Sequence, residues 1–432
     1  VNSFEGGLLG TVGGLAIAPG VPNSAVDATT TANQNFLAGF EHGERSCASP
    51  LSSANACLPP VSIAVAPSGE LRAPYSMQWS FALEHQIGDT ANLRAQYVGT
   101  RAVNQPYTTQ VNGYQTVCQG CFSPFAYRQA PDPRFGAVTQ LNTGANSAYS
   151  GLQLTAGKQM GHGLNGQVNY TWSHCIDEVS NGGFLAFSAG ALPSPLPNDL
   201  IRDRGSCDYD VRNNLTAEYV YQFPGRAWHD RFLRGLLNGW QASGTAFWHS
   251  GVPFSVLSAP YSANGNGIIN GSGPQFASVV PGVPLYEHNP IPGVTQPATV
   301  QWLNPNAFIS SVNPSTGACT EGDSATRCQF GDLGRNALRG PDFFWSDLYL
   351  TKWFSLSEHL RLRIDAQFFN VFNHPNFALP TNVYAGIPGN PATQTGFGAL
   401  TYTTAPPTGL LGVGLGGNSA PRMIALQVRL EF

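Results

Sequence analysis

The final twelve residues of the chain alternate between apolar and polar side chains. In the sequence PRMIALQVRLEF, Gln427, Arg429 and Glu431 lie between members of an apolar set. That set is Ile424, Leu426, Val428, Leu430 and Phe432. Because successive side chains of a strand point to opposite faces, the pattern predicts a strand with one apolar face. A strand of a soluble β-sandwich would show the same alternation, so the fold depends on whether the pattern recurs.

Eight more segments of ten to twelve residues carry this alternation. They span residues 75–86, 91–100, 149–160, 164–175, 213–223, 239–250, 343–354 and 359–370. A tilted strand needs about ten residues to cross a bilayer, whereas strands of soluble proteins cluster near five or six. Consecutive segments are joined alternately by turns of 3 to 15 residues and by loops of at least 37 residues. Outer-membrane β-barrels have this plan, with short periplasmic turns and long extracellular loops.

Aromatic residues on the predicted apolar face fall at two levels, as the interfacial girdles of a barrel require. The inner level contains Phe223, Trp240 and Phe432, and the outer level contains Trp172, Trp248, Phe344 and Phe368. Lys158 is in phase with the lipid-facing set, but it lies beside a periplasmic turn, where a cation costs about 0–1 kcal/mol. The longest turn predicts a short surface helix, because apolar residues recur there at helical spacing. These are Phe232, Leu233, Leu236 and Leu237.

Composition supports a membrane setting. Only 11% of the residues are charged, against about 25% in soluble domains, while Gly and Pro supply 49 and 33 residues. The net charge of −4 has no basic stripe, so neither nucleic-acid binding nor attachment to an anionic membrane surface is indicated. The uncharged run at residues 6–26 is interrupted by Gly and Pro and does not predict a spanning helix. Lacking an initiating Met and a signal sequence, the chain is expected to begin within a longer polypeptide or after processing.

Eight cysteines lie in the long loops or at the outer ends of strands, so all are predicted on the extracellular side. An even count on one oxidising face predicts local disulfides. Proximity pairs Cys47 with Cys57, Cys118 with Cys121, Cys175 with Cys207, and Cys319 with Cys328, although eight cysteines permit about 105 pairings. The Cys118–Cys121 motif has a redox or zinc alternative, but neither a second pair at zinc spacing nor a βαβ pattern accompanies it.

Other candidate chemistry is sparse. Asp203, Asp208 and Asp210 could bind calcium or supply paired carboxylates for hydrolysis, but they lack ion-loop spacing, so a solvated, partly lumen-facing loop is the preferred interpretation. The glycine-rich run at residues 409–417 lacks the flanking strand and helix of a phosphate-binding loop. The histidines at strand ends occur singly, at His174, His249, His359 and His374. We therefore assign no catalytic, cofactor-binding or metal-binding residue and expect that the protein is not an enzyme.

Several longer stretches, from about residue 73 to the end, share a further likeness. They include APYSMQWSFALEHQIG, YSGLQLTAGKQMGHGLNGQVNYTWSHCID, RGSCDYDVRNNLTAEYVYQFPG, FGDLGRNALRGPDFFWSDLYLTKWF and RLRIDAQFFNVFNHPNF. Together they resemble the barrel motifs of TonB-dependent receptors of the Oar-like kind. The sequence departs from this family after the DYDVR segment, where Asn213 and Asn214 stand in place of the basic residue and aromatic that often begin the next strand.

The resemblance implies a barrel of about 22 strands, an N-terminal plug and, ahead of the plug, an Ig-like domain. It also implies that the TonB energy-coupling complex acts through the plug region, which has no match in this sequence. The terminal strand with Phe432 would be the signal read by the barrel-assembly machinery. An exposed edge strand with an apolar face and a free carboxylate is suited to capture by strand addition.

The sequence thus predicts an all-β fold, an antiparallel transmembrane outer-membrane β-barrel of which this chain supplies about nine long strands and long extracellular loops. Residues 1–74 are expected to be an extracellular loop region and residues 75–432 the C-terminal part of the barrel. Since nine is odd, we expect a curved sheet with two unpaired edges, closed in outer-membrane lipid by strands from elsewhere.

The expected function is energy-coupled uptake of a bulky nutrient, such as a siderophore, an oligosaccharide or a peptide-like ligand. Two alternatives remain open. The first is a structural or adhesive outer-membrane barrel without transport. The second is a secreted soluble β-sandwich or propeller with a lectin or hydrolase role, which would require the apolar faces to pack against one another.

Overall fold

A computed structural model defines the fold over most of the predicted strands. It describes residues 34, 61–65, 71–111, 114–118, 121–124, 135–161, 163–180, 200–201, 203–225, 231–258, 276–290, 300–309, 332–357, 360–384, 396–401, 403–404 and 421–432. Most of the region 1–74 therefore lies outside the described residues. Within that region, strand β1 (Val61–Val65) pairs in parallel with the sheet described below.

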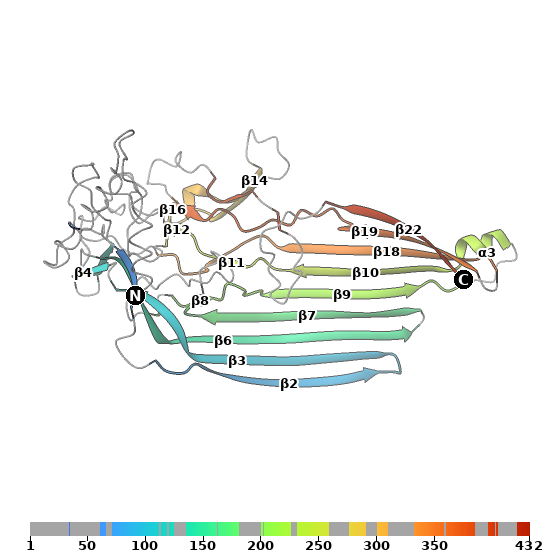
Figure 1. The fold of residues 1–432 in the computed structure, drawn as a ribbon, viewed down its shortest axis with the longest axis horizontal. Helices are drawn as coiled ribbons and strands as arrows, with labels where there is room; N and C mark the ends of the chain where they lie inside the picture. The colour runs from blue at the N-terminus through green and yellow to red at the C-terminus, as the bar shows by residue number, and fades with distance from the viewer. Residues whose placement is uncertain are drawn as a thin grey trace.

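Nine long strands form one antiparallel sheet whose spatial order follows the chain, β2-β3-β6-β7-β9-β10-β18-β19-β22. They are β2 (Tyr75–Ile87), β3 (Ala91–Gln110), β6 (Phe135–Gly161), β7 (Leu164–Asp177), β9 (Asn213–Gln222), β10 (Trp240–His249), β18 (Phe343–Ser355), β19 (Arg361–Phe369) and β22 (Met423–Glu431). Figure 1 shows the short turns gathered at one end of the sheet and the long connections at the other. The nine predicted strands and their alternation of short and long connections are confirmed.

The apolar sets of all nine strands lie on one face because the register keeps them in phase. Directly paired residues of an antiparallel sheet point to the same side. One continuous row of such pairs crosses seven strands through Leu83, Ala95, Leu154, Tyr170, Leu215, Trp248 and Phe344. On the last strands, Ala366 pairs with both Leu350 and Leu426. The opposite face carries mainly amide, hydroxyl and charged side chains.

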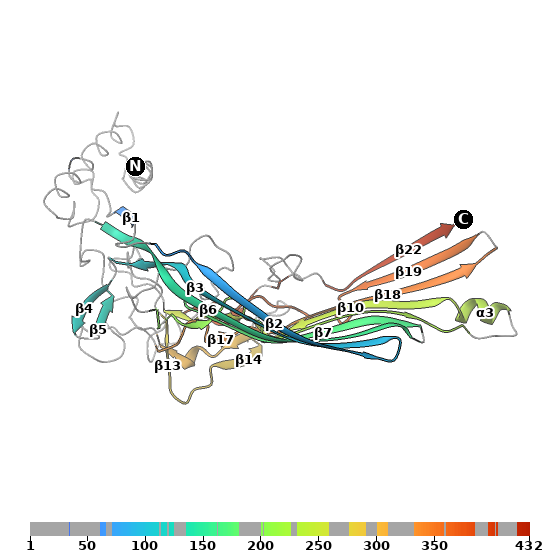
Figure 2. The same ribbon diagram turned by 90° about the horizontal axis from the view of Figure 1, so that it is seen from below.

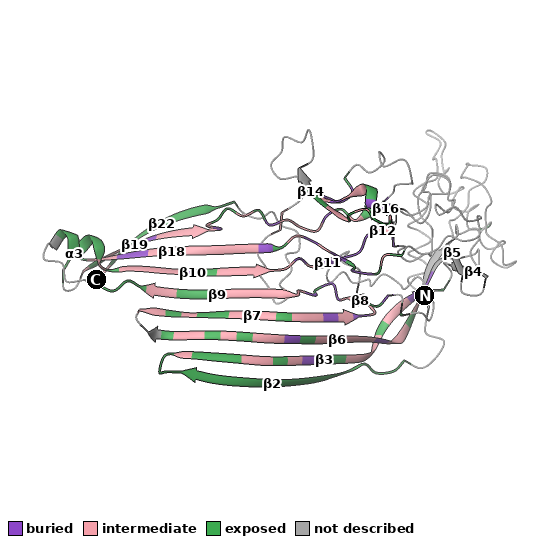
Figure 3. Cartoon of the chain, turned by 180° about the vertical axis from the view of Figure 1, so that it is seen from behind, coloured by how far each residue is buried: buried purple, intermediate pink, exposed green. Residues whose placement is uncertain are grey.

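The apolar face is bare. Phe81, Trp172 and Leu426 on this face are 65%, 60% and 76% exposed, and Figure 3 shows exposed residues along the full length of β2 and most of β22. Figure 2 shows the sheet as a single twisted layer, and among the described residues no second sheet packs against it. The soluble β-sandwich is therefore not the fold, because its apolar faces would have to cover one another.

Two strands run well beyond their predicted ends. β3 continues to Gln110 and β6 begins at Phe135, and the two remain paired from Ala102 onward through register shifts around Gln105. This extension has no regular apolar alternation, because it lies past the segment that the alternation identifies as membrane-spanning. A two-residue strand, β8 (Gly205–Ser206), pairs with the outer end of β7.

The long connections β10–β18 and β19–β22 fold into a layer at the outer end of the sheet, here called the outer layer. Its short strands are β11 (Pro253–Phe254) with β17 (Leu338–Arg339), β12 (Leu257–Ser258) with β20 (Val383–Tyr384), β13 (Ser278–Val279) with β16 (Phe308–Ile309), and β14 (Tyr286–Pro290), β15 (Val300–Leu303) and β21 (Ala399–Leu400) in one sheet. The 3-10 helix η3 (Pro305–Ala307) belongs to it as well. A separate hairpin joins β4 (Tyr114–Cys118) to β5 (Cys121–Pro124).

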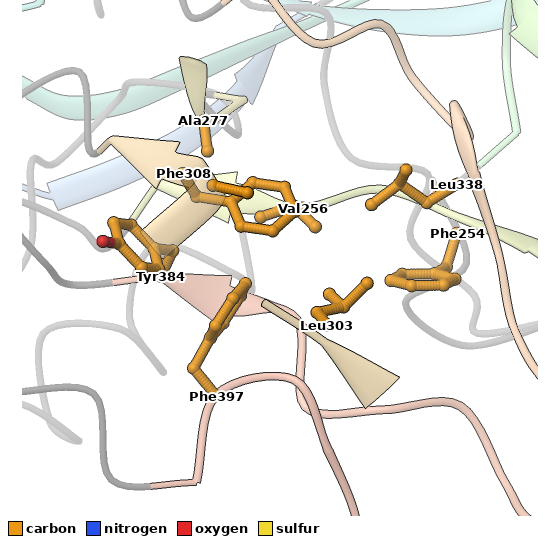
Figure 4. Close-up of a cluster of buried hydrophobic side chains, with 9 residues drawn as sticks. Phe254, Val256, Ala277, Leu303, Phe308, Leu338, Tyr384 and Phe397 are labelled. Carbon is orange, nitrogen blue, oxygen red and sulfur yellow. The ribbon is translucent and has the colours of Figure 1, made fainter. Parts of the chain in front are cut away.

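The outer layer has its own apolar core. Phe254, Leu303 and Phe308, from the β10–β18 connection, and Tyr384, from the β19–β22 connection, are at most 2% exposed. Figure 4 shows their side chains pointing toward one another, with Tyr384 and Phe397 closing one side. Rings of Phe308 and Phe397 meet edge to face with centroids 5.3 Å apart. This core shows that the long connections form a packed structure.

The predicted helix is present as α3 (Arg231–Leu237), in the turn between β9 and β10. Gly239, at φ +78°, returns the chain to the sheet, and its carbonyl accepts from the N–H of Trp353 at 2.9 Å. A glycine in this left-handed conformation is a common helix terminator. No helix among the described residues has both the length and the apolar character needed to cross a membrane.

Candidate functional site

A buried ionic network joins the outer layer to the ends of β7 and β9. Its first hub is Arg335, which is 5% exposed and forms an ion pair with the Asp177 carboxylate. The guanidinium also donates to the carbonyl oxygens of Asp177 at 2.6 Å and Asp203 at 2.5 Å. One arginine from the β10–β18 connection thus holds the end of β7 and the loop that follows it.

Arg339 is the second hub. Its side chain pairs with the Asp210 carboxylate and donates to the carbonyl oxygens of Asp210 at 2.7 Å and Gly251 at 3.1 Å. Its own backbone N–H donates to the Tyr286 hydroxyl at 2.9 Å, and its carbonyl accepts from Trp302 Nε1 at 3.0 Å. Arg339 therefore connects the end of the sheet to an aromatic group on the outer layer.

That aromatic group consists of Tyr286, His288 and Trp302. His288 stacks on Tyr286 with ring centroids 5.7 Å apart and meets Trp302 edge to face at 4.2 Å. His288 is exposed and has φ +57°. Burial raises the pKa of the Tyr286 hydroxyl, despite the opposing effect of Arg339. The group is therefore a partly exposed stack of rings that hydrogen bonds to the Arg339 backbone hold in place.

The predicted solvated loop at Asp203, Asp208 and Asp210 is wrong. These residues are only 6%, 9% and 2% exposed. The Asp210 carboxylate accepts from the Cys175 backbone N–H at 2.7 Å, from Arg212 Nε at 3.0 Å and from Arg339. Burial by itself would raise the pKa of Asp210, but the hydrogen bonds from Cys175 and Arg339 outweigh it and lower the pKa. The Asp210 carboxylate thus accepts from two arginines and the Asp208 carboxylate from Asn336, partners that the loop sequence alone does not reveal.

Asparagine and glycine complete the network. Asn336, at φ +54°, donates from Nδ2 to the Asp208 carboxylate and to the Ser206 carbonyl at 2.8 and 2.7 Å. A Cβ on Gly205 would lie 2.2 Å from the Arg335 carbonyl oxygen, so this close backbone approach requires glycine.

The predicted pair Cys175–Cys207 is a disulfide beside this network. The two Cα atoms are 5.4 Å apart, and the backbone N–H of Cys207 donates to the Cys175 carbonyl. Backbone pairing places Cys118 opposite Cys121 in the β4–β5 hairpin, but their side chains are not described. Four other predicted cysteines lie outside the described residues, at Cys47, Cys57, Cys319 and Cys328.

The polar face of the sheet contains a groove with a volume of about 410 Å³. Its lining includes Asn92, Gln167, Glu218, Thr245 and Tyr349, which come from β3, β7, β9, β10 and β18. Amide, hydroxyl and carboxylate groups at this density are typical of a hydrated surface. Among the described residues, no group of three or more histidine, cysteine or acidic side chains has metal-site geometry.

Comparison with known proteins identifies the family. A family profile described as "Outer membrane beta barrel domain" matches residues 6–410. The chain belongs to this family. A comparison with curated proteins finds no match.

Among solved structures, the outer-membrane barrel chain is similar to the outer membrane transporter YddB from Escherichia coli, with 10% identity and a TM-score of 0.38 over 87% of this chain and 34% of that chain. It is also similar to the pyoverdine receptor FpvA from Pseudomonas aeruginosa PAO1, with 11% identity and a TM-score of 0.34 over 84% and 30% of the two chains. It is similar as well to a mutant of the ferric enterobactin receptor PfeA from Pseudomonas aeruginosa, with 12% identity and a TM-score of 0.34 over 84% of this chain and 31% of that chain. The chain spans about a third of the length of these proteins.

In this outer-membrane barrel, the bare apolar face contacts lipid. Trp248 and Phe344, predicted for the outer girdle, pair directly across β10 and β18. Lys158 lies on this face as predicted, opposite Ala91 and Gly166. A second cation, Lys352, lies on the same face, opposite Trp240 and Ile364. It was not predicted, although its phase with Phe344 and the apolar set of its segment could have revealed it.

The terminal strand of the barrel segment is an edge strand. β22 pairs only with β19, and β2 at the other edge pairs only with β3, within the part of the chain that the structure describes. The residues predicted for the assembly signal are all exposed, with Ile424 at 60%, Leu426 at 76%, Val428 at 67%, Leu430 at 50% and Phe432 at 98%. β22 therefore presents a free backbone edge and an uncovered apolar face.

Proposed function

We propose that the protein is a TonB-dependent outer-membrane receptor that takes up a bulky nutrient, and that it is not an enzyme. The observation that carries this proposal is the sheet with two open edges and a polar inner face. Nine strands are already present and the described sheet does not close, so a sealed barrel needs more strands. Wider barrels enclose a channel or a plugged lumen, unlike the side-chain-filled interior of an eight-stranded barrel.

The outer layer supports a receptor role. Its apolar core and the Arg335 and Arg339 hubs hold it in one arrangement over the end of the sheet. The Tyr286–His288–Trp302 stack is held by hydrogen bonds to the Arg339 backbone. Rigid aromatic surfaces bind ligands at low entropic cost. We propose that this layer captures the ligand and that a plug region, coupled to TonB, admits it.

Transport can be tested in cells that carry or lack the gene. Labelled ferric siderophores, oligosaccharides and oligopeptides are offered with and without a protonophore. We expect one class to accumulate only in cells with the gene, and accumulation to stop when the proton gradient is collapsed. Ligand binding to the cell surface without gradient-dependent accumulation would contradict transport and support the adhesive alternative.

We also propose that β22 is read by the barrel-assembly machinery. Its free edge allows strand addition, and its apolar face with Phe432 would direct the chain to the membrane. Removing Phe432 should lower the amount of folded barrel in the outer membrane, measured by heat-modifiable migration on gels. Replacing the exposed Asp89 in the β2–β3 turn with Ala, which keeps the turn length, is the control. Equal loss from both changes would show a general folding defect and contradict a signal at Phe432.

A further inference from the structure

Helix α3 exposes a compact apolar surface at the periplasmic end of the sheet. Four of its seven residues are large and apolar, and it contains no acidic residue. Their exposed fractions are 74% for Phe232, 38% for Leu233, 45% for Leu236 and 45% for Leu237. Adjacent exposed apolar side chains of this kind mark a contact surface.

Two hydrogen-bonding residues place this helix on the lipid-facing side of the sheet. Trp240 and Lys352 pair directly across β10 and β18, and Lys352 also pairs with Ile364, so both lie on the apolar face. Lys352 Nζ donates to the carbonyl oxygens of Gly235, at 2.6 Å, and Asn238. Trp240 Nε1 donates to the Leu236 carbonyl at 2.9 Å. The carbonyls at the end of α3, which lack partners within a helix, are thus held by side chains of the lipid-facing surface.

Aromatic rings and backbone carbonyls compensate the charge of Lys352 on the lipid-facing surface. The residue is 3% exposed, and its ammonium is 4.6 Å from the ring centroid of Phe354 and 5.5 Å from that of Trp240. Aromatic faces and helix C-terminal carbonyls both stabilise a cation. Lys352 can therefore remain at the membrane boundary and fix α3 against the sheet.

We infer that α3 is an interfacial anchor whose apolar side chains insert among the lipids of the periplasmic leaflet. The occupant is lipid because Trp240 and Lys352, which lie on the lipid-facing side of the sheet, hydrogen-bond directly to α3 and join its exposed apolar surface to that face. Short amphipathic helices bind this zone by burying an apolar face at the boundary between headgroups and acyl chains. The anchor would fix the depth and rotation of the barrel segment in the membrane.

Nitroxide accessibility tests the inference in the full-length protein reconstituted in lipid vesicles. Phe232 is replaced by p-acetylphenylalanine, which keeps an aromatic side chain, and a nitroxide is attached to its ketone. The matched control carries the same label at Asp89, in the short β2–β3 turn at the same end of the sheet. Collision rates are measured with oxygen, which concentrates in the bilayer, and with a water-soluble nickel chelate.

We expect the oxygen-to-nickel collision ratio to be several-fold higher at position 232 than at position 89. Replacing Lys352 with Met should bring the ratio at position 232 toward that at position 89, because the helix loses two hydrogen bonds to the sheet. A label at position 232 as accessible to nickel as the control would place α3 in water and overturn the inference. A label shielded from both reagents would show that protein covers α3, which would also overturn it.

Discussion

Replacing Arg335 with Met should loosen the outer layer more than any other single change of charge in the network. Methionine keeps an unbranched apolar stem but removes every donor. Asp177 would then remain only 5% exposed without its cation. Removing one partner of a buried ion pair costs about 3–5 kcal/mol, because the remaining charge stays desolvated. Since 1.4 kcal/mol is tenfold, the open population should rise between about a hundred and a few thousand fold.

Limited proteolysis with chymotrypsin measures this opening, because cleavage at Phe254 and Phe308 requires exposure of the outer-layer core. Under conditions where reclosing is faster than cleavage, the cleavage rate follows the open population. The control is Arg94→Met, which removes an ion pair between Arg94 and Glu84. The side chain of Arg94 is 44% exposed and that of Glu84 is 68% exposed. Exposed pairs of this kind contribute about 0–1 kcal/mol. Cleavage of Arg335→Met at the rate of the control would refute the assigned role of Arg335.

Three further changes test the same region by the same assay or by hydrogen exchange. The lowered pKa of Asp210 means that its stabilising contribution is present above the ordinary carboxyl value of 3.8 and is lost as pH falls through its folded pKa. Protection factors in the outer layer, which correct for the pH dependence of intrinsic amide exchange, should therefore fall on acidification in wild type but depend less on pH in Asp210→Asn. Replacing both Cys175 and Cys207 by Ala should lower the free energy of unfolding by about 3–4 kcal/mol, because the disulfide joins residues 32 apart in sequence. Proteolytic cleavage in the β7–β9 loop should then become faster, and equal cleavage rates with and without the disulfide would contradict this. Gly205→Ala should cost about 1–3 kcal/mol, because the new Cβ would meet the Arg335 carbonyl; Gly334→Ala, with nothing within 4 Å of its Cβ, is the matched control and should be neutral.

The membrane-spanning part of the fold could be predicted from the sequence because its determinants are local. Each strand carries its own alternation, and each short turn sets the register of its hairpin. The predicted segment 213–223 and the observed β9 differ by one residue, and the segment 343–354 and β18 also differ by one. The extension of β3 to Gln110 was missed because residues past the membrane no longer need to alternate.

The outer layer could not be predicted because its partners are distant in sequence. Its strands contain two to five residues, too few to show a period. The Arg335 guanidinium and the Asp203 carbonyl that it contacts are 132 residues apart. A loop rich in aspartate indicates solvent exposure when its own composition is considered alone. By contrast, the Cys175–Cys207 pair was predicted correctly, since β8 returns beside the end of β7 and brings the sulfurs together.

Local alternation along each strand therefore specifies the membrane-spanning sheet, whereas contacts between distant residues specify the outer layer. Arg339 joins the two parts. Its side chain pairs with Asp210, just before β9 begins, so its position depends on that of the membrane-spanning sheet. Its backbone orients Tyr286 and Trp302 in the outer layer. An apolar contact in place of Arg339 could cover the core, but it could not set the angle of the outer layer, because hydrophobic contact is non-directional. Hydrogen bonds from a planar guanidinium are directional and fix the partners' geometry. This explains why buried charge is retained at the junction: it fixes where the exposed aromatic stack stands relative to the sheet.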